Sequence, residues 1–530
     1  MTNDWAERQW GQSPLGDKRL QKRAVKIGEA CLRLPDRTLP KKFGTWGDTK
    51  GAYRFFDSPS VSHEALQMEH NRNVIEAASK SPLSVLFIQD SSELSYNDHP
   101  YTNGLGPTAD SFGQGILFHT CLAVEWSPNC PPEVLGIAKQ IPWIRPDEPV
   151  SKKGKDERRK ESMVWIDTLR SIGRPPENVQ WISVGDRGND FFDYMCEARK
   201  TGWEYVLRGK HNRTIVVDGG EQKLHSWVRG IAPGAEYELS LRSRGQKFSR
   251  EAHLKISWGK IVITDPKGHG ETVDVTCVRA YDPEDERLEW ILLTSLPVDS
   301  SEDALRIVKI YEQRWIIEEY HKCLKTGCKI EEAQLKTANR LLALLGILGV
   351  VATQLLWLRD ISRRHPDSLA CEYVERDVID AIRSLCKLTG PVTITVKELW
   401  RRIAMLGGFL GRKSDGNPGW QTIWSGWLRV QDVLTGMAIA RSPAQSRSII
   451  TPVRITAIGL PFASSLTFPF SSRDSLNISA ILSSRFVSRA SRAPRSNRRV
   501  NLASPTGIST SFLILGSRFV VSIVRSWLQR

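Results

Sequence analysis

Two patterns divide the chain: short apolar runs bounded by turn residues, and longer segments with apolar residues at every third or fourth position. The apolar runs predict buried strands at 84–89, 118–125, 179–184 and 205–208. The first leads into Asp90 and a polar turn of Ser91, Ser92 and Glu93, and the third leads into Asp186. Because ligands of α/β sheets bind beyond the carboxyl ends of the strands, both aspartates are candidates for a site.

An amphipathic helix is predicted between residues 301 and 327. Ser301 can cap its start and Gly327 can end it. Its apolar face carries Leu305, Val308, Ile316 and Leu324. The helix can therefore rest on a core and leave its other face free for binding.

The other face of this helix carries one acid among several cations. Glu318 lies four residues from both Arg314 and Lys322, and two turns from both Tyr311 and Lys325. The layout is typical of a phosphate-binding surface. An exposed helix with Glu–Lys pairs would show the same spacing, and this segment alone does not separate the two interpretations.

Asp90, Asp186 and Glu318 together offer three carboxylates from two strand ends and one helix. Singly, each aspartate fits a turn former or a helix cap equally well. As a set, they supply the oxygen ligands that Mg²⁺ or Mn²⁺ prefers, and two such ions about 3.5–4 Å apart clamp both oxygens of a reacting phosphodiester. The set predicts metal-dependent phosphoryl transfer.

The spacing around the last acid, Y-x2-R-x3-E-x6-K from Tyr311 to Lys325, resembles that of the DDE transposases of the insertion-sequence family four type. Further blocks resemble the family in the same order: GAYRF at 51–55, DSSELSY at 90–96, RGKH at 208–211, WILLTS at 290–295, EEYHK at 318–322 and LGGF at 406–409. The resemblance extends from about residue 5 to about residue 440. Several collinear blocks are far more specific than one motif.

The resemblance implies roles for individual residues. Asp90, Asp186 and Glu318 would be the catalytic acids and would hold the metal, two Mg²⁺ or Mn²⁺ ions. The residues expected to contact DNA are Tyr311, Arg314, Lys322, Lys325, Arg208, Lys210, Arg54 and Trp290.

Trp290 is expected to stack on a base that is flipped out when the DNA end closes into a hairpin, since an indole face stabilises an unstacked base by about 1–3 kcal/mol. The alternative is an ordinary core aromatic at the start of a strand, because an apolar run follows it directly.

The expected architecture is α/β: an RNase H-like catalytic core with a β-rich insertion, between helical N-terminal and C-terminal domains. Residues 1–66 would bind the DNA ends, or else cap the catalytic sheet. Residues 67–365 would form the catalytic domain, with the insertion at about 209–300. Residues 366–442 would form a dimerisation domain in which Trp420, Trp424 and Trp427 make either a dimer contact or core packing.

The positive charge is concentrated after residue 442. Of the net charge of +15, the segment 443–530 supplies +11, from 12 arginines and a single acid, Asp474, which leaves only +4 for the rest. In the body, cations gather at 41–42, at 152–160 and along the catalytic helix, as a DNA track requires. The segment 443–530 is rich in Ser and Arg and shows no sustained period; it is either out-of-frame sequence or a DNA-binding arm.

Composition excludes other classes of protein. The nine cysteines form no CxxC pair, which argues against a disulfide framework and a zinc site. No signal peptide is expected at the N-terminus, and the run 512–524 is too short to span a membrane. We expect a cytoplasmic, nucleoid-associated transposase, a homodimer on paired ends that joins transposon ends to target DNA. The alternative is a cleavage-inactive DNA-binding derivative that inhibits transposition.

Overall fold

The structure is a computed structural model that describes residues 2–108, 113–146, 161–241, 250–268, 270–388, 393–412, 415–441, 499–502, 509–515 and 518–524. Its contacts divide the chain into two units, Met1–Ile439 and Ala440–Arg530. The basic cluster predicted at 152–160 lies outside the described residues, as does most of the segment 443–530.

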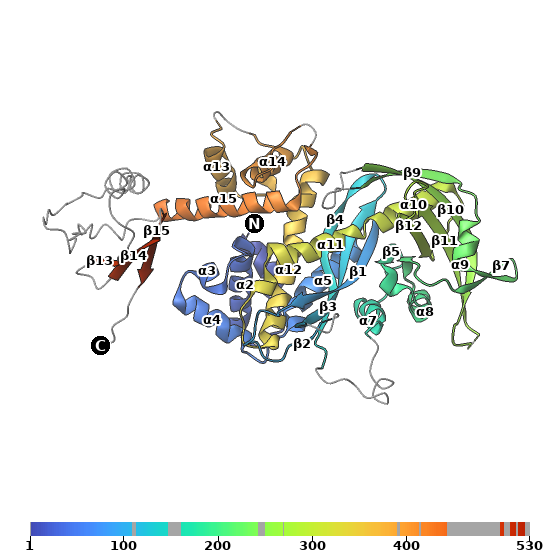
Figure 1. The fold of residues 1–530 in the computed structure, drawn as a ribbon, viewed down its shortest axis with the longest axis horizontal. Helices are drawn as coiled ribbons and strands as arrows, with labels where there is room; N and C mark the ends of the chain where they lie inside the picture. The colour runs from blue at the N-terminus through green and yellow to red at the C-terminus, as the bar shows by residue number, and fades with distance from the viewer. Residues whose placement is uncertain are drawn as a thin grey trace. The chain divides into compact units, whose positions relative to one another are not determined.

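A twelve-stranded mixed sheet forms the centre of the first unit (Figure 1). Its main path runs β2-β3-β1-β5-β6-β12-β11-β10-β7-β8, with β4 paired to β3 and β9 paired to β10. The strands are β1 (Ser84–Ser95), β2 (Gly106–Pro107), β3 (Gln114–Ser127), β4 (Cys130–Trp143), β5 (Trp181–Gly185), β6 (Glu204–Arg208), β7 (Thr214–Val217), β8 (Gly220–Lys223), β9 (Ala235–Leu241), β10 (Arg250–Thr264), β11 (Thr272–Tyr281) and β12 (Glu289–Thr294).

The strand β1 lies in the middle of the sheet, where its run from Val85 to Ile88 is fully buried. It pairs in parallel with β5 as far as Ile88 and Val184, and antiparallel with β3 along its whole length. All four predicted strands are present, but β1 is longer than expected. The residues Ser91 to Glu93 were predicted as a turn, and this was wrong: β3 supplies hydrogen-bond partners that carry the strand on to Ser95.

The β-rich stretch predicted after residue 209 extends the central sheet instead of standing apart from it. The strand β12 pairs with β6, and β11 and β10 continue from there. The turn expected near residue 218 is present: Asp218 and Gly219 both have positive φ, 48° and 79°, which suits the tight hairpin between β7 and β8.

Helices cover both faces of the sheet. One core contains Val85 and Phe87 of β1 together with residues of α7 (Met163–Ile172) and α8 (Phe192–Thr201). The other contains Leu86 and Ile88 together with residues of α10 (Ser301–Glu312), α11 (Trp315–Lys322) and α12 (Ala338–Arg364). A short helix, α9 (Leu224–Arg229), packs on the far strands. Odd-numbered side chains of β1 therefore face α7 and α8, and even-numbered ones face α11.

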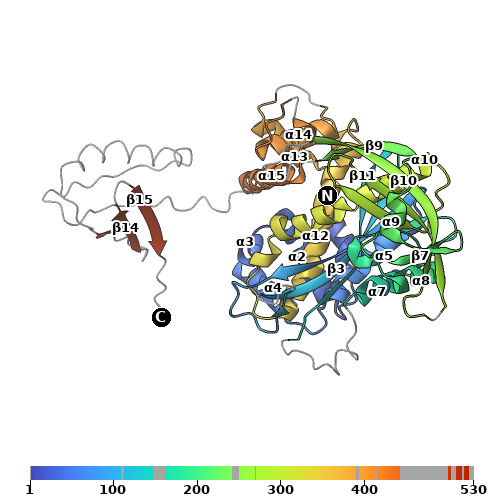
Figure 2. The same ribbon diagram turned by 45° about the vertical axis from the view of Figure 1, so that its right-hand side comes forward.

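Helices also precede the sheet, as predicted from the patterning at 19–32 and 51–56. They lie beside α12 in both views (Figures 1 and 2) and contact it through α2, α4 and α5. They are α1 (Thr2–Trp10), α2 (Lys18–Arg33), α3 (Leu39–Phe43), α4 (Trp46–Phe56) and α5 (His63–Ser79).

The helix α12 is long and apolar enough to cross a membrane, with a mean hydropathy of 2.3 over its best window. However, 82% of that window is buried within the structure, between the sheet and the N-terminal helices. Among its charged residues, Arg359 contacts both Asp360 and Glu319 of α11, and Arg359 and Asp360 are each 3% exposed. The helix is thus a core element that is tied to α11 by buried charges.

The last helices of the first unit are α13 (Arg376–Leu385), α14 (Val396–Leu406) and α15 (Trp420–Arg441). Trp420, Trp424 and Trp427 are buried within the chain itself, and Trp427 packs on Trp400 of α14 at 5.7 Å between ring centroids. Of the two interpretations of these tryptophans, the structure favours core packing.

In the second unit, the described residues form a small antiparallel sheet of β13 (Arg499–Leu502), β14 (Ser509–Leu515) and β15 (Arg518–Val524). The sequence shows no sustained period in this region, so these strands were not predicted. The apolar run 512–524 supplies two of them.

The buried charges of α12 generate a stability prediction. Arg359→Met removes the buried guanidinium that pairs with Asp360 and Glu319, and we expect a loss of about 3–5 kcal/mol in the free energy of unfolding, measured by urea denaturation. The control is Lys80→Met, which removes an exposed pair with Glu76 and should cost less than about 1 kcal/mol. Equal losses in the two variants would contradict a structural role for the buried cluster.

Candidate functional site

Asp90 lies in β1, two residues beyond the last parallel pair with β5. Its side chain is 20% exposed, and its Oδ1 accepts a hydrogen bond of 2.8 Å from the backbone N–H of Ser91. Burial, and then the nearby charge of Asp186, raise the pKa of Asp90 to about 7, against the opposing effect of Arg314. Asp90 is thus a partly buried carboxyl in a crowded acidic environment.

Asp186 directly follows β5, as predicted, and caps a short 3₁₀ turn at Arg187–Asn189. Its Oδ1 accepts a hydrogen bond of 2.8 Å from the N–H of Gly188. Because β1 and β5 are parallel neighbours, Asp90 and Asp186 emerge at the same edge of the sheet. Asp90, just beyond the parallel pairing of β1 with β5, and Asp186, just after β5, therefore lie near each other, although Asp90 is inside its strand and not at its end.

The helix that carries Glu318 is broken, whereas a continuous helix was predicted. The first part, α10, is capped by Ser300 through a capping box with Asp303, so the expected cap at Ser301 was wrong by one residue. The second part, α11, continues into a π-helical turn at Cys323–Gly327. Gln313 and Arg314 separate the two parts as a short turn that keeps right-handed helical backbone angles.

Arg314 links the acids across this break. Its guanidinium pairs with the carboxylate of Glu318 and lies 3.8 Å from Oδ2 of Asp90. The side chains of Arg314 and Glu318 are 18% and 31% exposed, so the pair is shielded from solvent more than a surface ion pair. Asp90, Asp186 and Glu318 are therefore brought to one place, with Arg314 among them.

A buried hydrogen-bond network links α11 to the sheet close to the three acids. The Tyr320 hydroxyl, two residues after Glu318, accepts a bond of 3.0 Å from Nε2 of Gln140, which also donates to Oγ1 of Thr120 at 2.9 Å. Thr120 is the partner of Asp90 across the β1–β3 pair. Gly349 of α12 packs closely on this network, because a Cβ there would lie 3.2 Å from the Tyr320 oxygen.

The donor set fits a hard divalent cation, because the three side chains offer only oxygen ligands. Within the described parts of the chain, no three acidic, histidine or cysteine side chains converge closely enough to hold a metal as they stand. The Arg314 guanidinium provides the positive charge between Asp90 and Glu318. By the chemistry of their donors, Asp90, Asp186 and Glu318 would hold the metal.

Trp290 and Tyr311 lie next to Arg314. Their rings meet edge to face at 5.2 Å, with Trp290 half-buried at the start of β12 and Tyr311 only 4% exposed. Burial raises the pKa of Tyr311, while the guanidiniums of Arg208 and Arg314 lower it. Arg208 also donates to the backbone oxygen of Glu289 at 3.0 Å. An aromatic pair and two arginines thus border the acids.

Lys322 and Lys325 have described contacts with other residues. Lys325 lies 4.0 Å from a carboxylate oxygen of Glu331, and the ammonium of Lys322 lies over the ring of Trp420 at 5.7 Å. Neither has a described contact with the acids. Their predicted contacts with DNA remain predictions.

Lys210 lies in the loop after β6, and Asp190 holds this loop in place. The Asp190 carboxylate accepts from the backbone N–H groups of Lys210 and His211, at 2.6 and 2.9 Å, and pairs with Arg213. Asp190 is 1% exposed. Sequence reasoning missed this role, although Asp190 lies in the same loop as Asp186. The remaining predicted DNA contact, Arg54, is exposed on α4, apart from the acids.

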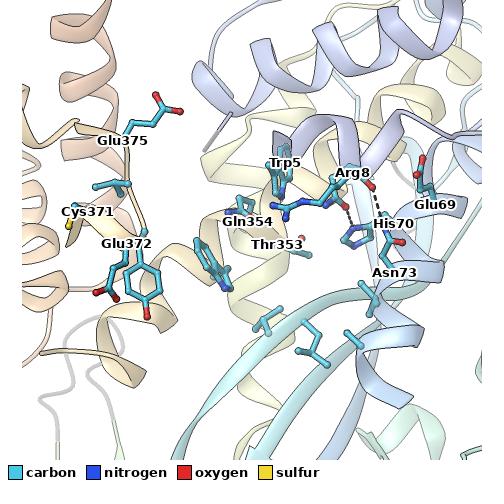
Figure 3. A pocket seen from close by; sticks show the side chains of 18 residues that line it. Trp5, Arg8, Glu69, His70, Asn73, Thr353, Gln354, Cys371, Glu372 and Glu375 are labelled. Atoms are coloured by element: carbon cyan, nitrogen blue, oxygen red, sulfur yellow. Dashed lines mark hydrogen bonds between the residues drawn. The ribbon is translucent and has the colours of Figure 1, made fainter. Parts of the chain in front are cut away.

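A large cavity formed by the described residues is not lined by the acids. One cavity of about 960 Å³ lies between α1, α5, α12 and the segment 371–375, and Figure 3 shows Trp5, Arg8 and His70 on one side with Cys371 and Glu372 opposite. Neither Asp90, Asp186 nor Glu318 contributes to its wall. The side chains of Asp90 and Glu318 are 20% and 31% exposed, so the candidate site is partly open to solvent.

Comparison with known families agrees with this geometry. Residues 2–61 match a transposase DNA-binding domain, residues 149–353 a transposase DDE domain, and residues 350–447 the transposase Tn5 dimerisation domain. The DDE match includes Asp186 and Glu318, whereas Asp90 precedes it. This domain has an RNase H-like core, which confirms the predicted fold class. The chain belongs to the DDE transposases of the Tn5 type, DNA-binding and dimer-forming enzymes that cleave and join DNA with divalent metal ions.

Proposed function

We propose that this transposase binds the terminal inverted repeats of an insertion sequence, cuts them through a hairpin intermediate and joins them to target DNA. The observation that carries the proposal is the gathering of Asp90, Asp186 and Glu318 around Arg314, beside the Trp290–Tyr311 pair. It would act as a dimer on paired ends, in the cytoplasm on the chromosome.

The proposed reaction is a series of in-line displacements at phosphorus. Water attacks the phosphodiester at the transposon end and releases a 3′-hydroxyl; this hydroxyl attacks the opposite strand and closes a hairpin. A second water reopens the hairpin, and the 3′-hydroxyl then attacks target DNA. In each step one P–O bond forms and another breaks, so a single site can serve every step.

Each residue of the site has a role in this scheme. Asp90, Asp186 and Glu318 would hold two Mg²⁺ or Mn²⁺ ions, which supply nucleophile activation and charge neutralisation when bound. Arg314 and Arg208 would orient the phosphates through charge-assisted hydrogen bonds. The contact of Trp290 with Tyr311 would leave the exposed part of the indole free to stack on an extruded base.

A test of the acids uses isosteric neutral variants. We expect Asp90→Asn, Asp186→Asn and Glu318→Gln each to lower end cleavage at least about 1,000-fold, because each removes a charge that acts in the chemical step. Binding of end DNA should change little, since phosphate contacts elsewhere supply most of the affinity. Nicking and gel-shift assays with Mg²⁺ measure the two effects. The control is Asp193→Asn, because Asp193 lies on α8 and pairs with Lys267. Near-normal nicking by any of the three test variants would show that the replaced acid does not belong to the site.

Trp290→Ala should leave first-strand nicking nearly intact and slow hairpin formation by about tenfold or more, because stacking of about 1–3 kcal/mol is needed only for the extruded base. Denaturing gels separate the nicked and hairpin products. Trp258→Ala serves as the matched control, since Trp258 is also half-buried and lies on β10 of the same sheet. Loss of both steps to the same degree would make Trp290 a structural residue.

The alternative function, a cleavage-inactive inhibitor, is favoured only by the unusual segment after residue 441, which forms a separate unit.

If this segment is an addition, truncation after Arg441 should retain specific end cleavage. It should also flatten the salt dependence of non-specific DNA binding, because a net charge of +11 is removed. Salt titrations of binding to end DNA and unrelated DNA measure both. A truncated protein that no longer distinguishes the two would show that the segment is part of the DNA interface.

A further inference from the structure

Buried hydrogen bonds link five polar side chains beneath the acids, on the sheet face that α7 and α8 cover. We call this set the buried chain; its members are Ser91, His119, Gln89, Ser183 and Tyr194. All but Ser91 are 0% exposed. A buried polar network of this kind is costly unless every member finds its partner, so its presence calls for a physical reason.

The direction of each bond can be assigned. Burial lowers the pKa of His119 to about 3, so the ring is neutral. The Oε1 of Gln89 can only accept; Nε2 of His119 therefore donates to it at 3.0 Å, and Nδ1 accepts from the Ser91 hydroxyl at 2.8 Å. The Gln89 amide donates to Oγ of Ser183 at 2.9 Å and to the Tyr194 hydroxyl at 3.1 Å. Those two hydroxyls bond to each other at 2.6 Å.

The buried chain links β1, which carries Asp90, to β5, which leads into Asp186. Gln89 and Ser91 flank Asp90 in β1, and strand alternation sends them to the α7–α8 face while Asp90 faces α11. Ser183 lies in β5, three residues before Asp186, and pairs with Phe87 across the parallel register. A lateral shift of either strand end would therefore break hydrogen bonds in the buried chain.

The loop of Asp186 rests on the same support. The ring of His119 packs against that of Trp165 at 4.5 Å between centroids. A Cβ on Gly188 would lie 3.4 Å from the Trp165 ring and 3.0 Å from Oδ1 of Asp186. The turn that orients Asp186 is thus in contact with the aromatic ring that packs on the buried chain.

We propose that the buried chain fixes the separation of the Asp90 and Asp186 carboxylates and thereby sets the affinity of the site for divalent cations. Gln89 and Tyr194 are positioning residues: they do not touch substrate, and they act through the two aspartates. The inference rests on the proposed function, in which these aspartates hold the metal. Residues that orient metal ligands commonly change metal affinity about 10–100-fold when they are replaced.

The test measures Mn²⁺ binding to the full-length protein, from the electron paramagnetic resonance signal of free Mn²⁺, without DNA or turnover. Gln89→Met keeps the side-chain volume and removes three hydrogen bonds, and we expect the Mn²⁺ concentration for half-saturation to rise about tenfold. Tyr194→Phe removes only the hydroxyl and should raise it about threefold. The matched control is Tyr205→Phe, because Tyr205 is 1% exposed and its hydroxyl has no hydrogen-bond partner among the described residues; its binding should be unchanged.

Thermal unfolding of the same variants separates positioning from stability. Mn²⁺ binding equal to that of the wild type in both Tyr194→Phe and Gln89→Met would overturn the inference, whatever their melting temperatures. Should Gln89→Met fail to fold, the comparison of Tyr194→Phe with Tyr205→Phe decides. Asp90→Asn separates a failure of the metal site from a failure of the buried chain. If Asp90→Asn binds Mn²⁺ normally, the proposed metal site is wrong. If Asp90→Asn loses binding while Gln89→Met and Tyr194→Phe keep it, the metal site stands and the proposed role of the buried chain is wrong.

Discussion

Carboxylates crowded into a partly buried site repel one another, and the guanidinium of Arg314 offsets that repulsion here. Two like charges 4 Å apart cost about 4 kcal/mol at the effective dielectric of a protein surface, an amount comparable to a large part of the stability of a domain. Arg314 contacts both Asp90 and Glu318. Arg314 lies four residues before Glu318, so the two side chains pair along one face of the helix while the same guanidinium lies near Asp90 of β1.

The strand β1 has a different task on each of its faces. Towards α11 it presents Asp90, and Thr120 beside it belongs to the network that anchors Tyr320 and so the helix of Glu318. Towards α8 it presents Gln89, which is bonded to β5 and so to the strand of Asp186. The period of two in a β-strand thus separates the reacting group from its supports, and a shift of one residue in register would exchange them.

The sequence predicted those parts of the site that follow from local patterns. The apolar run before Asp90 and the spacing around Glu318 were enough to predict a buried strand and a helix. The continuation of β1 to Ser95, the break at Arg314 and the anchoring role of Asp190 were not predictable in this way, because each depends on a partner elsewhere in the chain. Propensity describes a segment, whereas these features arise where segments meet.

The separation of the acids along the chain has a consequence during synthesis. More than two hundred residues lie between Asp90 and Glu318, and the helix of Glu318 packs against β1 only after the strands from β3 to β12 have been made. At a translation rate of about 5–20 residues per second, the ribosome takes roughly 10 to 50 s to cover this distance. During that interval the nascent chain carries first one and then two of the three acids, without the third. The order of residues along the chain thus prevents the three acids from assembling until nearly the whole catalytic domain has been synthesised.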